Sequence, residues 1–234
     1  MIDFISTLAS HAPEWLTRLW PALGQTLLLT SCSFLLALGL AAPLEFGRAC
    51  RWSPVPQLVT IYIDVVRSIP ILAILYLIYF GLPGIGISFS AFVSGVIGLG
   101  VVYSTYVAEV LRAGVQSLHK GQKEASLAVG MTPFSTFRWI ILPQAVRVVV
   151  PPLLLTLISL LKDTSICALI TVNELMLTSK LIMSEFFLPL HIFVLVGLIY
   201  FAIAWPMSLF VRWLEPQLNR GRRTGSTPIQ QVLH

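Results

Sequence analysis

Long apolar runs separated by short polar stretches dominate the pattern of hydrophobic and polar positions along this 234-residue chain. A bilayer core roughly 30 Å thick requires about 20 apolar residues for each helical span. The runs long enough to span lie at residues 23–44, 57–80, 89–107, 148–172 and 186–211. The pattern therefore predicts an all-α membrane protein with five transmembrane helices.

The composition agrees with this pattern and excludes a large soluble part. Hydrophobic residues make up 56% of the chain and charged residues only 11%, whereas a soluble domain carries about 25% charged residues. The formal net charge is +5, but the basic residues are scattered around the apolar runs rather than gathered on one face. We therefore expect a lipid bilayer and not a nucleic acid as the surrounding partner.

Most Lys and Arg residues lie on one side of the predicted spans, and this asymmetry sets the orientation. The residues on that side are Arg48, Arg51, Arg112, Lys120, Lys123, Arg138, Arg147, Arg212, Arg220, Arg222 and Arg223. The opposite side holds only Arg18 and Lys180. Because positive charge favours the cytoplasmic side, we expect the N-terminus outside and the C-terminus in the cytoplasm.

Three parts follow from this topology. Residues 1–21 form an extracytoplasmic interfacial segment, 22–215 the transmembrane domain, and 216–234 a basic cytoplasmic tail. One helical face in the first part carries Trp15, Leu16, Leu19 and Trp20. This face fits a segment lying on the outer leaflet, and a simple belt of aromatic residues would fit equally well.

Ionisable residues inside the second span suggest a binding site. A charge in hydrocarbon costs about 2.5 to 3.5 kcal/mol on insertion scales, so Arg67 requires a partner or a polar path. Pro70 cannot donate a backbone hydrogen bond, so we expect the helix to break between Ser68 and Pro70 and then restart. A restarting helix beside Arg67 would suit a substrate carboxylate, whereas a pair of Arg67 with Asp64 would only fix packing.

The fourth span carries a second pair of charges, Lys162 and Asp163. Neighbouring residues on a helix point about 100° apart, so the two side chains cannot both face lipid without cost. Asp163 with Thr164 and Ser165 could receive a substrate ammonium group, and with Arg67 it would match a zwitterion. Alternatively, contacts with other helices satisfy both charges.

Glu109 lies near the end of the third span, one turn before Arg112. Salt bridges form readily at this spacing on a helix, so a gate or a structural pair is favoured over direct substrate contact. Glu109 together with Asp163 would nevertheless favour a cationic substrate. The histidines and cysteines show no spacing typical of a metal site.

The long connection at residues 118–143 predicts two short helices meeting at an angle. Gly130 follows a helix-forming stretch at the position of a C-terminal cap. Thr132 then suits an N-cap and Pro133 the first helical position. The apolar residues Leu127 and Val129 would otherwise face water, which suggests a docking surface for another protein.

The same connection resembles the EAA loop of ABC importer permeases. The residues that carry the resemblance are Glu124, Ala125, Ser126, Gly130, Ile140, Leu142 and Pro143. Ser126 replaces the usual second Ala of that motif. Further stretches resemble the polar amino acid subfamily: VRSIPILAILYLIYFGLP (66–83), YVAEVLRAGVQSLHKGQKEA (106–125), LPQAVRVVVPPL (142–153) and LKDTSI (161–166).

This resemblance implies a type I ABC importer permease of the bacterial inner membrane that carries polar amino acids. Its expected partners are a second permease subunit, identical or homologous, two cytoplasmic ATP-binding subunits and an extracytoplasmic amino acid binding protein. The loop would insert into the ATPase and transmit its closure. The chain itself lacks a GxxxxGK[ST] motif, so ATP and Mg would bind the partner ATPase, and we expect no cofactor and no enzymatic activity on this chain.

Two other functions remain alternatives at this point. An ion-coupled secondary amino acid carrier would work alone and should show an internal inverted repeat, and none is evident in the sequence. A membrane scaffold would not explain the ionisable residues within the spans.

Overall fold

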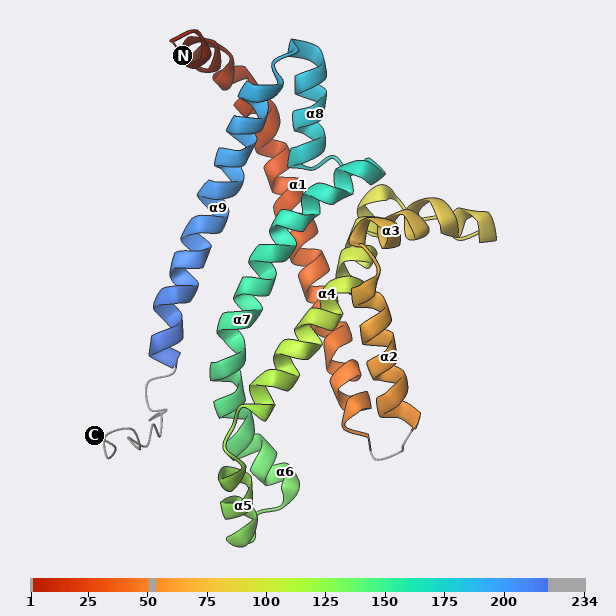
Figure 1. Ribbon diagram of the computed structural model, residues 1–234, viewed down its shortest axis with the longest axis vertical. Helices are drawn as coiled ribbons and strands as arrows, with labels where there is room; N and C mark the ends of the chain where they lie inside the picture. Colours follow the sequence, from red (N-terminus) through yellow and green to blue (C-terminus); the bar gives the residue numbers. More distant parts are fainter. Residues whose placement is uncertain (1, 51–53, 219–234) are drawn as a thin grey trace, which may run out of the picture.

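The computed structural model describes residues 2–50 and 54–218. Within this part, the regular elements are all helical (Figure 1). The α-helices are α1 (Ile2–Arg48), α2 (Pro54–Ser68), α3 (Ile71–Tyr76), α4 (Ala91–Gln116), α5 (Lys120–Ala128), α6 (Pro133–Thr136), α7 (Leu142–Asp163), α8 (Leu175–Phe186) and α9 (Pro189–Leu218). Shorter π and 3-10 turns extend α3 at Leu77–Gly81 and Leu82–Ile85, lead into α7 at Phe137–Ile141 and follow it at Thr164–Ile170.

Four of the described helical segments are long and apolar enough to cross a membrane. They run over residues 4–48, 91–116, 133–170 and 189–218. A fifth results if α2 and the helical stretch 71–85 count as one span, although the two are bent by 99°. The five-span prediction therefore holds with a sharply bent second span, and the break falls at Ile69 and Pro70, as the sequence predicted.

The core lies where α4 packs against α1, α7 and the bent second span. Buried apolar side chains from α1, α3, α4 and α7 form one cluster there. A Cβ added at Gly100 of α4 would lie 2.6 Å from Leu36 Cδ2 of α1, and one at Gly114 would clash with Val149 of α7. Small residues at these positions therefore allow the close approach of helices that is typical of membrane interfaces.

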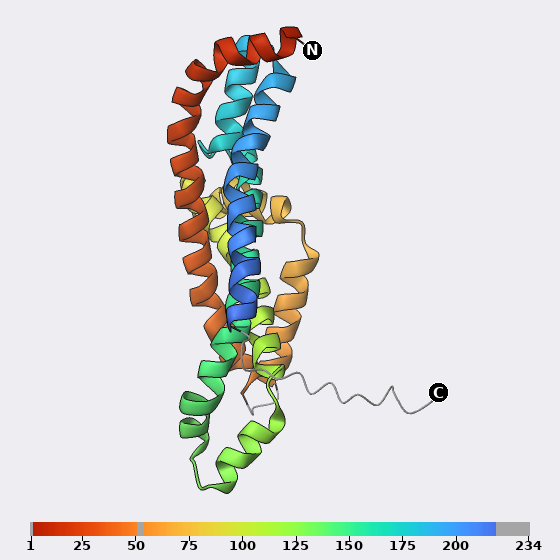
Figure 2. The same cartoon turned by 90° about the vertical axis from the view of Figure 1, so that its left-hand side faces the viewer.

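A second apolar cluster closes the end of the molecule that holds the chain's first residues. Figure 2 shows the first turns of α1 bent over α8 and α9 at this end. Trp15 and Leu19 are buried there against α8 and α9, whereas Trp20 is 75% exposed. The expectation that Trp15, Leu16, Leu19 and Trp20 share one lipid-facing helix face is therefore wrong. Trp15 and Leu19 lie in the cluster, whereas Leu16 and Trp20 lie on the surface.

Several boundaries differ from those predicted. Helix α4 continues to Gln116, so Glu109 and Arg112 lie within a helix rather than at its end. Helix α8 was not predicted, and it begins where the Glu174 carboxylate accepts a hydrogen bond from the Leu177 N–H at 2.8 Å. Of the predicted tail 216–234, the first three residues continue α9, and residues 219–234 lie outside the described part, as do Met1 and residues 51–53.

Candidate functional site: a polar row through the spans and a projecting helix pair

Arg67 lies at the end of α2, next to the break in the second span. Its guanidinium carbon is 4.9 Å from the centre of the Tyr106 ring on α4, a cation–π contact. Within the described part, no ion pair joins Arg67 to Asp64, so the packing pair considered above does not form. The charge of Arg67 is thus supported by an aromatic face and has no carboxylate partner there.

Two tyrosines of α4 connect Arg67 with Asp163. The Tyr106 and Tyr103 rings are 5.7 Å apart, and the Tyr103 hydroxyl donates a hydrogen bond of 2.7 Å to Asp163 Oδ2. Arg67, Tyr106, Tyr103 and Asp163 therefore form a continuous set, which we call the α2–α7 polar row. It links, through two tyrosines, the two charges that the sequence proposed as carboxylate and ammonium sites.

The polar side chains predicted to assist Arg67 and Asp163 form hydrogen bonds within their own helical segments. The hydroxyls of Ser68 and Ser165 donate to the carbonyls of Asp64 and Lys162, respectively. Thr164 is fully buried and bonds the Leu161 carbonyl, so in this conformation it does not face a solute. Pro70 acts through the backbone, since it begins α3 with an extended ψ of 137°.

Glu109 is held by two arginines. Its Oε1 lies 2.7 Å from Arg48 Nη2 on α1, and its Oε2 lies 2.6 Å from Arg112 Nη2 on α4. Arg48 also reaches Glu45 at 3.3 Å. We call these four residues the α1–α4 ion cluster. It confirms the Glu109–Arg112 pair, and each oxygen of Glu109 already has an arginine partner.

A polar cavity of about 470 Å³ lies beside the cluster. The residues lining it are Arg48, Pro56, Thr60, Asp64, Arg67, Glu109 and Arg112. Arg67 thus belongs both to the α2–α7 polar row and to the wall of this cavity. The cavity can offer the Arg67 cation to a solute carboxylate, whereas Asp163, at the other end of the row, does not line it.

The helix pair α5–α6 projects from the end of the molecule opposite α8 (Figure 1). Gly130 has φ +83°, and the Met131 N–H donates to the Ser126 carbonyl at 3.1 Å, which is a Schellman-type C-cap. The Thr132 hydroxyl accepts a hydrogen bond from the Ser135 N–H at 3.2 Å, with Pro133 in the first turn. The predicted caps at Gly130, Thr132 and Pro133 are confirmed.

A hydrogen bond between side chains also joins the two helices. Ser126 is buried and its hydroxyl donates to Thr136 Oγ1 at 3.1 Å. Glu124 and Ala125 are exposed, as are Leu127, Val129 and Phe134, the last two at 78% and 75%. Leu142 and Pro143 begin α7, at the point where the pair joins the spans. The pair therefore presents apolar side chains outward, as a docking element would.

The sequence did not identify Tyr103, Tyr106, Arg48 or Glu45 as site residues. A carboxylate beside an apolar span is visible in a sequence, but the helix that will face it is not. The spacing of Tyr103 and Tyr106 on one face of α4 was the available signal. Arg48 counted only as an orientation charge.

Comparison with known proteins agrees with this architecture. Residues 35–220 match the family described as "Binding-protein-dependent transport system inner membrane component". The chain belongs to this family, which confirms a multi-pass inner membrane transport component and does not support an ion-coupled carrier.

Particular relatives have similar lengths. The chain is 36% identical over 193 residues to the "Probable amino-acid ABC transporter permease protein YckA" of Bacillus subtilis (strain 168), covering 82% of this chain and 85% of that protein. It is 32% identical to the "Arginine ABC transporter permease protein ArtQ" of Haemophilus influenzae, covering 90% and 97%. The predicted resemblance to ABC importer permeases is therefore confirmed.

Solved structures share the fold. The "Crystal structure of an amino acid ABC transporter with histidines" contains a chain that matches with a TM-score of 0.80 at 30% identity, covering 93% of this chain and 99% of that one. A chain of the MetNI methionine ABC transporter matches with a TM-score of 0.62 at 20% identity, covering 85% and 95%, which shows the fold alone. The type I permease fold is confirmed by these matches.

Proposed function

We propose that this chain is the membrane-spanning subunit that carries polar amino acids in an ATP-driven importer. The observation that supports this most directly is the α2–α7 polar row, which offers a cation at Arg67 and an anion at Asp163. A free amino acid carries both a carboxylate and an ammonium group, so each end of the row would suit one of its two charges. The names of the relatives, among them amino-acid and arginine permeases, agree with this substrate class.

The charge pattern favours the α-ammonium group as the partner of Asp163. Both oxygens of Glu109 are held by arginines, so Glu109 does not add a second acceptor for a cationic side chain. Within the described part, Asp163 Oδ1 accepts no hydrogen bond, and it is this oxygen that would receive the ammonium. Arg67 would bind the substrate carboxylate.

The helix pair α5–α6 would couple this path to ATP. Its exposed apolar side chains would dock on a cytoplasmic ATP-binding subunit, which would hold ATP and Mg. Five spans do not readily enclose a path, so a second permease subunit, identical or homologous, would complete it around a two-fold axis. Two ATPases and an extracytoplasmic amino acid binding protein would complete the importer.

This arrangement requires the helix pair and the C-terminus on the cytoplasmic side. A reporter that is active only in the cytoplasm should work when it is fused after residue 223. The same reporter fused at Gly84 should not. The reverse pattern would contradict the proposed orientation.

Reconstitution tests the function itself. The permease would be purified with its ATPase and binding protein and placed in liposomes, and the uptake of labelled amino acids would be measured. We expect accumulation that requires ATP and the binding protein. Uptake driven by an ion gradient without ATP would contradict the proposal.

A further inference from the structure

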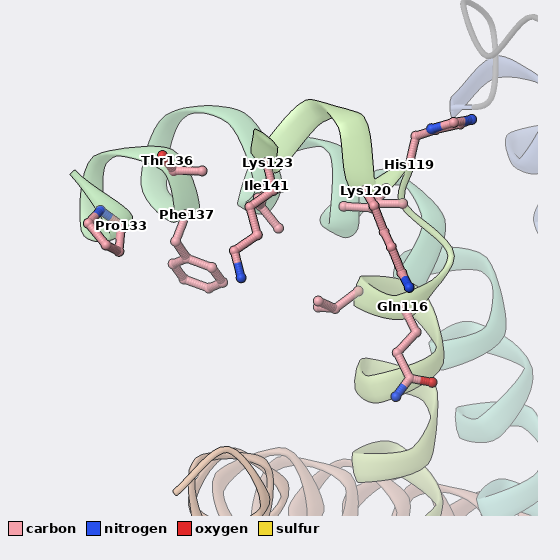
Figure 3. Close-up of a pocket in the computed structure, with 10 residues that line it drawn as sticks. Gln116, His119, Lys120, Lys123, Pro133, Thr136, Phe137 and Ile141 are labelled. Atoms are coloured by element: carbon pink, nitrogen blue, oxygen red, sulfur yellow. The ribbon is translucent and has the colours of Figure 1, made fainter. Parts of the chain in front are cut away.

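A cavity of about 630 Å³ lies between the last turns of α4 and the helix pair α5–α6. Its ionisable lining residues, among those described, are all basic or histidine: His119, Lys120 and Lys123. Figure 3 shows the Lys120 and Lys123 side chains projecting from α5 into the space between Gln116 and Phe137. The cavity therefore presents concentrated positive charge.

No carboxylate neutralises these lysines within the described part of the chain. The ion pairs there involve Arg18 with Glu185 and the α1–α4 ion cluster. Glu124 lies on the same helix but does not line the cavity. The two ammonium groups are thus available to an anion.

The rest of the lining is largely apolar. It consists of Val115, Leu118, Pro133, Phe137 and Ile141, with the small polar contribution of Gln116 and Thr136. A free inorganic anion would gain nothing from these side chains. A ligand with both an anionic group and an apolar part would use the whole cavity.

The position of the cavity adds an independent argument. It lies where two apolar spans, 91–116 and 133–170, approach each other at the end that carries α5 and α6. Trp139 is 70% exposed nearby, with the Arg138 guanidinium 5.8 Å from its ring centre. Exposed Trp beside Arg and Lys is typical of the level where hydrocarbon meets lipid headgroups.

We propose that this cavity binds one anionic phospholipid. The anionic headgroup contacts Lys120 and Lys123, and the start of an acyl chain lies against Phe137 and Ile141. Basic pockets at the cytoplasmic ends of spans suit anionic headgroups, and each lysine changes the affinity by roughly fivefold. The bound lipid would connect α4 to the helix pair, so lipid composition would tune the position of that pair.

Native mass spectrometry of the full chain, without ATPase, nucleotide or amino acid, tests this site. Phosphatidylglycerol or phosphatidylcholine would be titrated onto the delipidated permease. We expect one phosphatidylglycerol to bind more tightly than phosphatidylcholine. Lys120→Gln with Lys123→Gln should weaken phosphatidylglycerol binding by roughly 30-fold, while Lys120→Arg with Lys123→Arg should retain it.

A charge-matched control separates the site from general attraction. Arg147→Gln with Lys180→Gln removes the same charge outside the cavity and should leave phosphatidylglycerol binding within about twofold of wild type. Equal weakening in both double variants would overturn the proposal, as would equal binding of the two lipids. If the glutamine variant does not fold, the wild type and the arginine variant still test the proposal. Both should bind phosphatidylglycerol more tightly than phosphatidylcholine.

Two further outcomes identify other occupants and would also overturn the proposal. Displacement of phosphatidylglycerol by an equal concentration of inorganic phosphate would indicate a free-anion site. Unchanged lipid binding together with loss of ATPase capture in the glutamine variant would indicate an acidic protein surface. Because the measurement contains neither ATPase nor substrate, failure of the transport function would not change its result.

Discussion

The helix pair α5–α6 and the α2–α7 polar row are held together by different kinds of contact. The pair is fixed by neighbours in sequence: a left-handed Gly130, an N-cap at Thr132 and the bond between Ser126 and Thr136. The row joins three helices through two tyrosines of α4. The first region should therefore keep its shape when the spans move, whereas the second changes whenever α2, α4 and α7 shift relative to one another.

This difference matches the proposed division of work. A rigid element is suited to transmit a push from an ATPase, and a site shared between helices is suited to bind and release a solute as those helices move. Substitutions in the helix pair should therefore leave substrate affinity intact, and substitutions in the polar row should leave binding of the ATPase intact. The following predictions test that separation, from the largest expected effect to the smallest.

Gly130→Val should abolish most substrate-stimulated ATP hydrolysis by the assembled importer. The residue has φ +83°, where a non-glycine residue costs about 1–2 kcal/mol and a β-branched one more, so the cap and the aim of α5 should change. Substrate affinity and membrane insertion should stay normal. Gly130→Asn is the matched control, because Asn tolerates this conformation, and full stimulation in the valine variant would remove the docking role of the pair.

Asp163→Asn should weaken substrate affinity by roughly 10- to 150-fold, because a hydrogen bond to a charged group is worth about 1.5 to 3 kcal/mol. The substitution keeps the size of the side chain and its bond from Tyr103. Binding of the ATPase should be unchanged. A normally assembled variant whose transport keeps the wild-type dependence on substrate concentration would show that this carboxylate does not bind the substrate.

Poor assembly of Asp163→Asn would favour the structural alternative. In that case Asp163 would serve only to neutralise a nearby cation, and its loss would leave an unpaired charge in the membrane. Assembly and affinity must therefore be measured on the same preparation.

Tyr103→Phe should lower substrate affinity by about fivefold, since it removes the hydroxyl that orients Asp163 and one hydrogen bond is worth about 1 kcal/mol. Tyr106→Phe is the matched control. It keeps an aromatic face under Arg67, and no hydrogen bond of the Tyr106 hydroxyl occurs within the described part. Similar losses in both variants, measured by substrate titration, would argue against the specific role of Tyr103.

Glu109→Gln should change stability and leave affinity nearly unaffected. The carboxylate holds two arginines with 23% of its side chain exposed, so the free energy of unfolding should fall by about 1–2 kcal/mol. Glu45→Gln should have a smaller effect, because Glu45 reaches only Arg48, at 3.3 Å. A large loss of affinity in Glu109→Gln, with thermal stability unchanged, would place Glu109 on the substrate instead.

The two regions also differ in how far the sequence predicted them. The caps at Gly130, Thr132 and Pro133 depend on residues within a few positions, so their signals were readable and are confirmed. Arg67 and Asp163 stood out as charges in apolar runs. Their link through Tyr103 and Tyr106 depends on how α4 packs between α2 and α7, which no local pattern encodes.

The same reason explains the errors in the fold. The break at Pro70 was predictable from one residue, but the 99° bend depends on packing of the following helix against α4. Trp15 and Leu19 lie on an apolar helix face that would suit lipid equally well. Only their packing against α8 and α9 places them in a core. Helix α8 is largely apolar but is shorter than a membrane span, so a search for spans passes over it.

The most direct test of the account is a structure of the assembled importer with an amino acid bound between the permease subunits. We predict density for the substrate carboxylate beside the Arg67 guanidinium and for its ammonium group beside Asp163 Oδ1, with the Tyr103 bond to Oδ2 retained. An amino acid bound away from both side chains, while Arg67 and Asp163 pair with other protein groups, would contradict the account.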